Sequence, residues 1–132
     1  MMALVDTSVW IEFFREGGFP LDAWVDFDEV VTCPPVIQEV LQGFREERAF
    51  RTAKEAMLAL PIVESPMGLE VYEHAAHLYR TVRGAGFTIR SGVDCLIAAC
   101  AIRNGLDILH CDRDFDALAR VGHFRSRNVR AS

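Results

Sequence analysis

The sequence predicts an α/β domain of three layers (α/β/α), in which helices cover both faces of a central parallel sheet of four to five strands. Short apolar runs of strand character alternate along the chain with longer segments of helical periodicity, and such alternation favours parallel strands joined by right-handed crossovers. In addition, the segment from Cys95 to Ile102 is apolar nearly all round. A helix without a polar face is a buried one, as expected beside such a sheet.

The N-terminal part predicts a strand, a helix and a second strand. Ala3–Val5 is a short apolar run. The polar residues that follow predict a turn in which Thr7 or Ser8 caps a helix, which leaves Asp6 free of a capping role. The glycine pair at 17–18 ends that helix, and residues 30–33 predict the second strand.

The middle of the chain predicts three helices and one strand. Pro34 and Pro35 begin a helix whose apolar side chains share one face, and residues 46–60 continue as another helix. Residues 61–64 predict a third strand. The Ser65-Pro66 pair then opens a helix that the glycines at 84 and 86 end.

The C-terminal part predicts the buried helix, a fourth strand, a short helix and an edge strand. The buried helix follows Ser91 and ends at Asn104-Gly105. Residues 107–112 predict the fourth strand, and a short helix containing Phe115 packs behind it. Residues 124–129 are a candidate edge strand.

Length and composition bound the class of protein. We expect residues 1–132 to form a single domain, because half of this length is close to the minimum for a self-sufficient core. The chain is 51% hydrophobic and 25% charged, which excludes a disordered chain. Its longest apolar run is far below the roughly 20 residues that cross a bilayer, and the N-terminus lacks the features of a secretory signal. We therefore expect no membrane association and a cytoplasmic location.

The cysteines and histidines do not predict a zinc site. The four cysteines form no C-x-x-C pair, and each lies in an apolar stretch, as expected of small buried side chains in a reducing compartment. His74 and His77 are spaced for one helix face, but no further zinc ligand lies close to them in sequence. An exposed helix face is the preferred interpretation of this pair.

Charge is distributed unevenly along the chain. Residues 1–79 hold 5 Lys or Arg and 14 Asp or Glu, whereas residues 80–132 hold 9 Arg and 5 Asp. Arginine matches phosphate geometry and stacks on bases, so the basic part is compatible with an RNA partner. We expect Arg83, Arg90 and Arg113 to form a positive path for RNA phosphates. The alternative is that scattered surface arginines only keep the domain soluble.

Acidic side chains are expected to converge at one edge of the sheet. Ligands of parallel sheets bind outside the carboxyl ends of the strands. Asp6 and Asp112 each end a predicted strand, with Asp114 two residues beyond the second. Glu39 lies about one helical turn after the second strand, and Asp94 lies in the first turn of the buried helix, which is expected at the same edge. An all-oxygen donor set suits Mg²⁺ or Mn²⁺, and the chemistry it favours is metal-assisted phosphodiester hydrolysis.

Each of these acids also has a structural alternative. Asp94 completes a Ser91-x-x-Asp94 arrangement typical of a helix N-terminus, where a carboxylate meets the helix dipole. Asp112 or Asp114 is positioned to cap the following helix, and Asp114 is the preferred cap of the two. Glu39 points away from the apolar face of its helix and, taken alone, is expected to be solvated. Their joint placement favours the metal site.

At these residues the sequence resembles the PIN-domain ribonucleases, specifically the VapC toxins of toxin–antitoxin pairs. Four segments carry the resemblance in the family's order, and they span nearly the whole chain: Leu4-Val5-Asp6-Thr7-Ser8-Val9-Trp10-Ile11, Glu39-Val40-Leu41-Gln42-Gly43, Ile89-Arg90-Ser91-Gly92-Val93-Asp94-Cys95-Leu96-Ile97-Ala98 and Asp112-Arg113-Asp114-Phe115. One departure is Cys111, where many relatives have Asn or Thr. This departure affects the expected contacts with substrate and not the acidic residues.

The resemblance implies a set of roles for these residues. Asp6, Glu39, Asp94 and Asp112 would be ligands of Mg²⁺ or Mn²⁺, with Asp114 as a fifth catalytic acid. Thr7, Ser8 and Ser91 would support them. The family also implies cleavage of tRNA or rRNA, a homodimer, and a VapB-type antitoxin whose C-terminal segment lies along the active-site groove. Surfaces around Trp10, Phe13 and Phe14 and around Val71, Leu78 and Tyr79 are candidates for the dimer contact.

Two functions from different classes are compatible with this sequence. The first is a Mg²⁺-dependent endoribonuclease that acts as the toxin of a type II pair. The alternative is a catalytically silent module that binds RNA or protein, which the intact acidic set disfavours because clustered carboxylates repel one another when no cation is bound. A phosphotransferase of the haloacid-dehalogenase type is excluded, because it needs a second Asp where this chain has Ser8.

Overall fold

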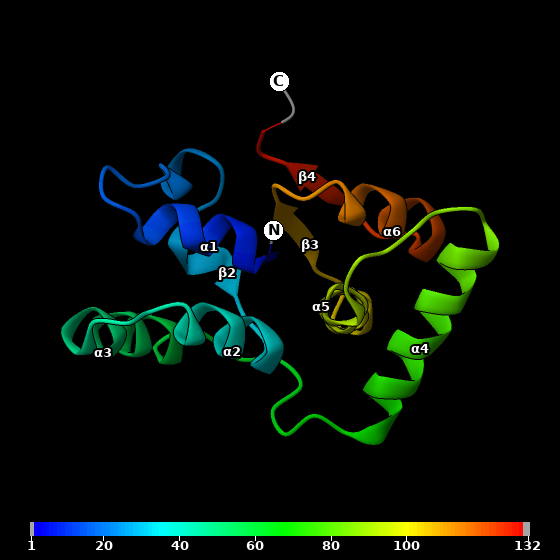
Figure 1. Cartoon of the computed structure of the whole chain (residues 1–132), viewed down its shortest axis with the longest axis horizontal. Helices are drawn as coiled ribbons and strands as arrows, with labels where there is room; N and C mark the ends of the chain where they lie inside the picture. The colour runs from blue at the N-terminus through cyan, green and yellow to red at the C-terminus, as the bar shows by residue number, and fades with distance from the viewer. Residues whose placement is uncertain (1, 131–132) are drawn as a thin grey trace.

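A parallel sheet lies at the centre of the protein. The computed structural model describes residues 2–130, and within them the sheet has four strands in the order β2-β1-β3-β4 (Figure 1). The strands are β1 (Ala3–Val5), β2 (Val30–Val31), β3 (Asp107–His110) and β4 (Ser126–Asn128). Every neighbouring pair is parallel, with Leu4 opposite both Val31 and Ile108. The predicted α/β class and parallel sheet are confirmed.

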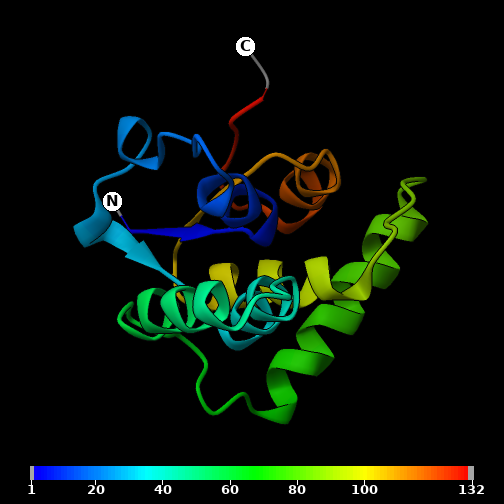
Figure 2. The ribbon, with the colours of Figure 1, turned by 60° about the vertical axis from the view of Figure 1, so that its left-hand side comes forward.

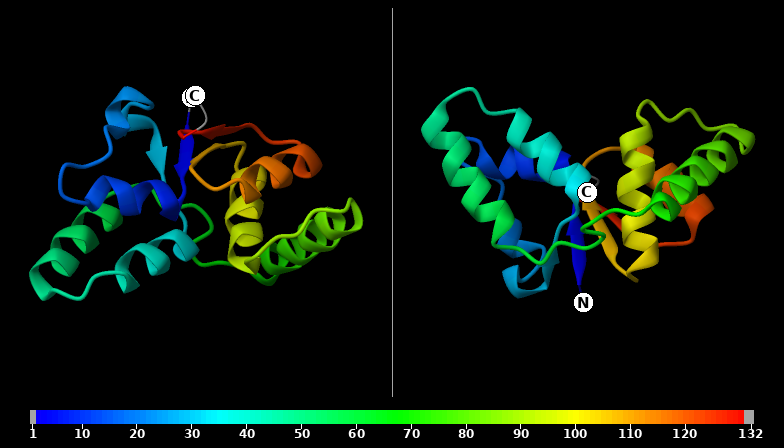
Figure 3. Two further views of the ribbon diagram at one scale, coloured as in Figure 1. Left: turned by 45° about the horizontal axis from the view of Figure 1, so that its top comes forward. Right: turned by 90° about the horizontal axis from the view of Figure 1, so that it is seen from below.

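Helices cover the sheet on both faces. Figure 3 shows α1 to α3 on one side of the strands and α4 to α6 on the other, which gives the predicted three layers. The bounds are α1 (Thr7–Phe14), α2 (Pro34–Gln42), α3 (Glu47–Leu58), α4 (Leu69–Gly84), α5 (Gly92–Arg103) and α6 (Asp114–Gly122). Two 3-10 turns, Leu21–Ala23 and Phe27–Glu29, connect α1 to β2.

The segment between α3 and α4 differs from the prediction. Residues 61–64 do not form a strand: Ile62 makes only an isolated parallel bridge with Thr32. Beyond it, Glu64 adopts a positive φ of 54°, which turns the chain away from the sheet. The helix predicted to open at Ser65-Pro66 begins instead at Leu69, after a loop that Figure 2 shows crossing to α4.

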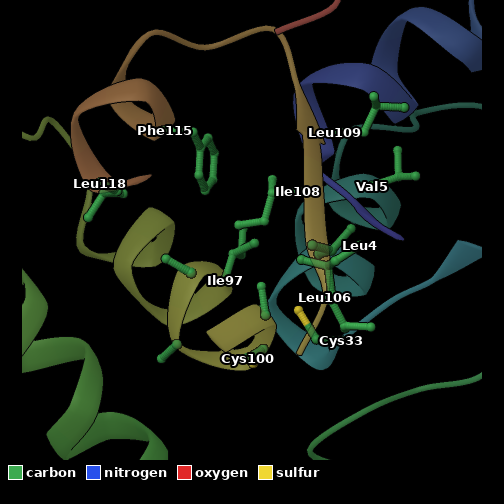
Figure 4. Close-up of a cluster of buried hydrophobic side chains, with 14 of the residues drawn as sticks. Leu4, Val5, Cys33, Ile97, Cys100, Leu106, Ile108, Leu109, Phe115 and Leu118 are labelled. Atoms are coloured by element: carbon green, nitrogen blue, oxygen red, sulfur yellow. The ribbon is translucent and has the colours of Figure 1, made fainter. Parts of the chain in front are cut away.

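The core lies mainly between α5, α6 and the two central strands. Ile97 on α5 faces Ile108 on β3, and Phe115 and Leu118 close the same space from α6 (Figure 4). Each fully buried side chain of this size stabilises the fold by roughly 1.5–3 kcal/mol. The prediction of a buried helix is confirmed, since six of the twelve residues of α5 are buried.

Burial confirms three cysteine predictions and excludes three of the six residues named for the dimer surfaces, whereas Phe13, Phe14 and Tyr79 are partly exposed. Cys33, Cys95 and Cys100 are buried free thiols, whereas Cys111 is only half-buried. Trp10, Val71 and Leu78 were predicted to line dimer contacts, but all three are buried within the chain. Helical periodicity does not distinguish a face that packs on the domain's own sheet from one that meets a partner. Across residues 2–130, no helix has the length and apolar character needed to cross a membrane.

The parallel arrangement brings three functional segments to one edge. The backbone N–H of Asp6 donates to the carbonyl oxygen of Leu109 over 2.9 Å, which ties the ends of β1 and β3 together. Both strands run towards this edge, and α1 and α6 begin just beyond them. The first turn of α5 carries Asp94 to the same place, within reach of the acids that follow β3.

Candidate active site

Asp6 is buried at the end of β1 and has one oxygen without a partner. Its Oδ2 accepts hydrogen bonds from the backbone N–H of Ser8, over 3.0 Å, and from the Ser8 hydroxyl. Its Oδ1 is buried and has no hydrogen-bond partner among residues 2–130. The prediction that Thr7 or Ser8 caps α1 is wrong, because Asp6 is the N-cap. The carboxylate reaches the N–H of Ser8 two residues on, and this leaves the Ser8 hydroxyl free to act as a donor.

Glu39 is joined to this site through Thr7. The Thr7 hydroxyl donates to Oε1 of Glu39 over 2.8 Å, a contact between residues 32 positions apart in the chain. Glu39 is half-buried on α2, so the expectation that it is solvated is wrong. The face of α2 opposite its apolar stripe points along the sheet edge towards α1, which a helical wheel cannot reveal.

Asp94, Asp112 and Asp114 form a compact group. Each offers one carboxylate oxygen, and these three oxygens lie within 4.8 Å of one another. Ser91 is the N-cap of α5, and its hydroxyl accepts from the N–H of Val93 over 3.2 Å. At the start of α6, Oδ1 of Asp112 accepts from the N–H of Asp114 over 3.0 Å. The preferred cap of α6 was Asp114, but Asp112 makes this contact, because Asp114 is itself inside the helix.

The pKa values show that the acids share one electrostatic environment. Burial, which is the larger cause, and the charges of Asp6, Asp112, Asp114 and Glu39 together raise the pKa of Asp94 to about 8. Burial also raises the pKa of Asp6 to about 6, although the hydrogen bonds that it accepts from Ser8 act in the opposite direction. The structure thus brings all five predicted acids within electrostatic reach of each other.

The donor set fits a divalent cation of the hard class. All the candidate ligand atoms are carboxylate oxygens, which Mg²⁺ and Mn²⁺ prefer over the nitrogen and sulfur ligands of zinc. The buried Oδ1 of Asp6 is a polar atom that lacks a hydrogen bond, and such atoms are costly unless something satisfies them. A cation at this edge would satisfy Oδ1 and neutralise the repelling carboxylates.

Of the three arginines predicted to bind RNA, two lie beside the acids and the third lies on α4. The Arg90 guanidinium bridges two acids: its Nη2 is 3.0 Å from Oδ1 of Asp112, and its Nε is 3.3 Å from Oδ2 of Asp114. Arg113 lies between those acids in sequence and is exposed. Arg83 lies in the last turn of α4, where its Nη1 donates to the Tyr79 hydroxyl over 3.2 Å.

Sequence reasoning missed His110. This residue is fully buried at the end of β3, and its Nδ1 accepts from the N–H of Asp112 over 3.2 Å. Its Nε2 lies 3.6 Å from Oδ1 of Asp116. Burial lowers the pKa of His110, so a neutral imidazole holds the backbone of Asp112. A histidine at a core-facing strand position, two residues before the first of two closely spaced acids, was the available signal.

Comparison with known proteins agrees with this geometry. The PIN domain family model matches residues 3–121. Ribonuclease VapC11 of Mycobacterium tuberculosis is 36% identical over 135 aligned positions, covering 98% of this chain and all of that protein. The chain belongs to the VapC family of PIN-domain proteins. The resemblance seen in its four acidic segments is therefore confirmed.

Solved structures share the fold of this VapC family member at low sequence identity. VapBC2 from Rickettsia felis, bound to a DNA fragment from its promoter, has a TM-score of 0.77 at 14% identity, covering 97% of this chain and 98% of that one. VapC20 of M. tuberculosis, described as a toxin that cleaves the sarcin–ricin loop, has a TM-score of 0.61 at 22% identity, covering 80% and 86%. Both extend the fold assignment over most of the chain.

Proposed function

We propose that this protein is a Mg²⁺-dependent endoribonuclease, with Mn²⁺ as a substitute, and that it acts as the toxin of a type II toxin–antitoxin pair. The observation that carries the proposal is the compact group of Asp94, Asp112 and Asp114, which lies within electrostatic reach of Asp6 and Glu39. The relative VapC11 bears the name ribonuclease, which supports the same activity here. We take residues 1–132 as one functional domain acting in the cytoplasm.

Asp6, Glu39, Asp94 and Asp112 would hold the cation, with Asp114 as the fifth catalytic acid. When bound, the cation supplies Lewis-acid chemistry: it lowers the pKa of an attacking water and offsets charge on the phosphate. The chain's own residues orient the ligands. Ser8 fixes one oxygen of Asp6, Thr7 fixes Glu39, and Ser91 sets the start of the helix that carries Asp94.

RNA is the substrate class that these surfaces fit best, and tRNA and rRNA are the proposed targets. Arg83, Arg90 and Arg113 were predicted to provide a phosphate path, and Arg90 and Arg113 lie immediately beside the acids. A strand of RNA must overcome repulsion from a protein of net charge −5, so local arginines and a bound cation are needed near the scissile phosphate.

A VapB-type antitoxin is the proposed protein partner of a homodimeric toxin. A groove of about 220 Å³ has apolar walls from Pro35, Met67, Tyr72 and Leu96, and Glu39 lines it together with Gln38 and Gln42. Such a groove suits an extended segment that seats apolar side chains and presents a basic residue to the acids. The similarity to the R. felis VapBC2 complex supports this pairing.

The test is cleavage by purified protein that is free of antitoxin. We expect discrete fragments from total tRNA or rRNA in Mg²⁺ or Mn²⁺, and none in EDTA. Asp6→Asn and Asp94→Asn should abolish cleavage, whereas Asp28→Asn, an exposed acid of the 27–29 turn, should cleave like wild type. Cation binding without cleavage of any RNA would instead favour the catalytically silent binding module.

A further inference from the structure

Arg90 occupies two carboxylates of the proposed site, namely Asp112, a proposed cation ligand, and Asp114, the fifth catalytic acid. Its guanidinium lies 3.0 Å from Asp112 and 3.3 Å from Asp114, while 65% of its side-chain surface remains exposed. A guanidinium and a divalent cation compete for the same oxygens, because each satisfies the same negative charge. A cation that binds Asp112 must therefore displace this guanidinium.

The groove that Arg90 lines also contains two further arginines, beside two acids. A groove of about 380 Å³ beside α6 is lined by Phe87, Arg90, Arg113, Asp114, Asp116 and Arg120, and we refer to it as the arginine groove. Arg120 lies over the Phe87 ring, with 5.9 Å from its guanidinium carbon to the ring centroid. Neither Arg113 nor Arg120 has an ion pair with a carboxylate among residues 2–130.

The backbone near Arg90 does not depend on the guanidinium. The backbone N–H of Arg90 donates separately to Oδ2 of Asp114 over 3.4 Å, and the side chain is mostly exposed. The guanidinium can thus leave while this residue stays in place. The guanidinium side of these ion pairs is open to solvent although Asp114 is buried, and this exposure makes the exchange accessible to a bound cation.

We propose that Arg90 couples cation binding to RNA binding: it bridges Asp112 and Asp114 when no cation is present, and the bound cation releases it into the arginine groove. There, together with Arg113 and Arg120, it binds an RNA phosphate next to the cleavage site. Three guanidinium groups around one groove present the forked donors that match phosphate oxygens. This inference rests on the proposed function, and it assigns Arg90 a positioning role towards both ligands.

The first arm of the test measures cation affinity without RNA. Mn²⁺ binding is measured by calorimetry for wild type, Arg90→Ala and Arg113→Ala. The two variants each lose one positive charge near the site. Arg90→Ala should bind Mn²⁺ about 3- to 10-fold more tightly than Arg113→Ala, because only Arg90 competes for the acids. Equal affinities, or weaker binding by Arg90→Ala, would overturn the competition. Arg90→Lys keeps the charge but not the forked guanidinium, so its Mn²⁺ affinity should lie between those of wild type and Arg90→Ala.

The second arm measures binding of a short fluorescent single-stranded RNA in EDTA and in Ca²⁺, which occupies a hard-cation site. Arg113→Ala and Arg120→Ala should weaken RNA binding by similar factors in both conditions. Arg90→Ala should weaken it about 3- to 10-fold in Ca²⁺ and by less than about twofold in EDTA, where Asp112 and Asp114 already hold the guanidinium. An equal loss in both conditions would refute the release of Arg90.

The two arms separate this inference from the proposed function. If wild type binds cation but no RNA and cleaves nothing, the nuclease proposal fails, and the release of Arg90 to phosphate fails with it. If wild type cleaves RNA but Arg90→Ala behaves like Arg113→Ala in both arms, only the coupling fails. Thermal melting of each variant checks that the fold is intact, as expected for changes at exposed side chains.

Discussion

Ser8 holds one oxygen of Asp6 and leaves the other facing the site. Its hydroxyl donates to Oδ2 of Asp6 and accepts from the N–H of Cys111, so it also joins the ends of β1 and β3. Ser8→Ala removes both contacts while the backbone bond from the N–H of residue 8 remains. We expect Mn²⁺ affinity to fall by about fivefold, since a hydrogen bond of this kind contributes about 1 kcal/mol.

Calorimetric titration with Mn²⁺ measures this effect. Thr52→Ala is the matched control, because the Thr52 hydroxyl also makes an intramolecular hydrogen bond but lies on the exposed face of α3. Unchanged affinity in Ser8→Ala would show that the backbone N–H alone orients Asp6.

The raised carboxyl pKa values predict how the metal-free protein responds to pH. Asp6 and Asp94 have pKa values of about 6 and about 8, against an ordinary value of 3.8. A carboxyl group with a raised pKa stabilises the fold while protonated, and this contribution is lost as pH rises through the raised value. In EDTA we therefore expect the free energy of unfolding to fall from about pH 6.5 to about pH 8.5.

Chemical denaturation across this pH range provides the measurement. His110 acts in the opposite direction, but it does so below its ordinary pKa of 6.5, outside the chosen window. Asp94→Asn should flatten the decline, because it removes the group with the higher of the two pKa values, and saturating Mg²⁺ should do the same in wild type. Wild-type stability that rises with pH in EDTA would contradict the shared electrostatic environment of the acids.

At the scale of elements, the buried helix α5 links the core to the site. Ile97 is fully buried, one turn beyond Asp94 on the same helix. Ile97→Ala should lower the free energy of unfolding by about 2–5 kcal/mol, and Ile97→Val by about 0.5–1.5 kcal/mol, because each leaves a cavity of different size. Urea denaturation measures both.

Leu69→Ala serves as the control for α5, since Leu69 begins α4 with 73% of its surface exposed. It should change the free energy of unfolding by less than about 0.5 kcal/mol. If Ile97→Ala cost no more than Leu69→Ala, α5 would not be the central packing element that its all-apolar sequence indicates.

Elements whose signals are local were predictable from the sequence, and elements that depend on a distant partner were not. The all-apolar character of α5 and the proline pair that begins α2 are local signals, and both helices form as expected. Residues 61–64 have strand-like composition, but the chain beyond β2 pairs with them only at the isolated bridge between Thr32 and Ile62. For the same reason, the sequence predicted that acids converge but not that Arg90, more than 20 positions away, bridges two of them.

At the scale of the whole molecule, the two ends of the chain differ in charge, and this asymmetry predicts a localised salt effect. Arg113 and Arg120 line the arginine groove, whereas Arg51 is exposed on α3, on the opposite side of the sheet. Each arginine that contacts a phosphate of single-stranded RNA contributes about 0.7 to the slope of log affinity against log salt concentration.

Arg113→Ala and Arg120→Ala should each reduce that slope by about 0.7, and Arg51→Ala should leave it unchanged, because only charges at the bound strand release counterions. The measurement is RNA binding in Ca²⁺ across a series of KCl concentrations. Equal reductions in all three variants would mean that RNA responds to the net charge of the protein rather than to this groove. A reduction confined to the two groove variants would mean that an acidic protein binds a polyanion through one basic surface next to its acids.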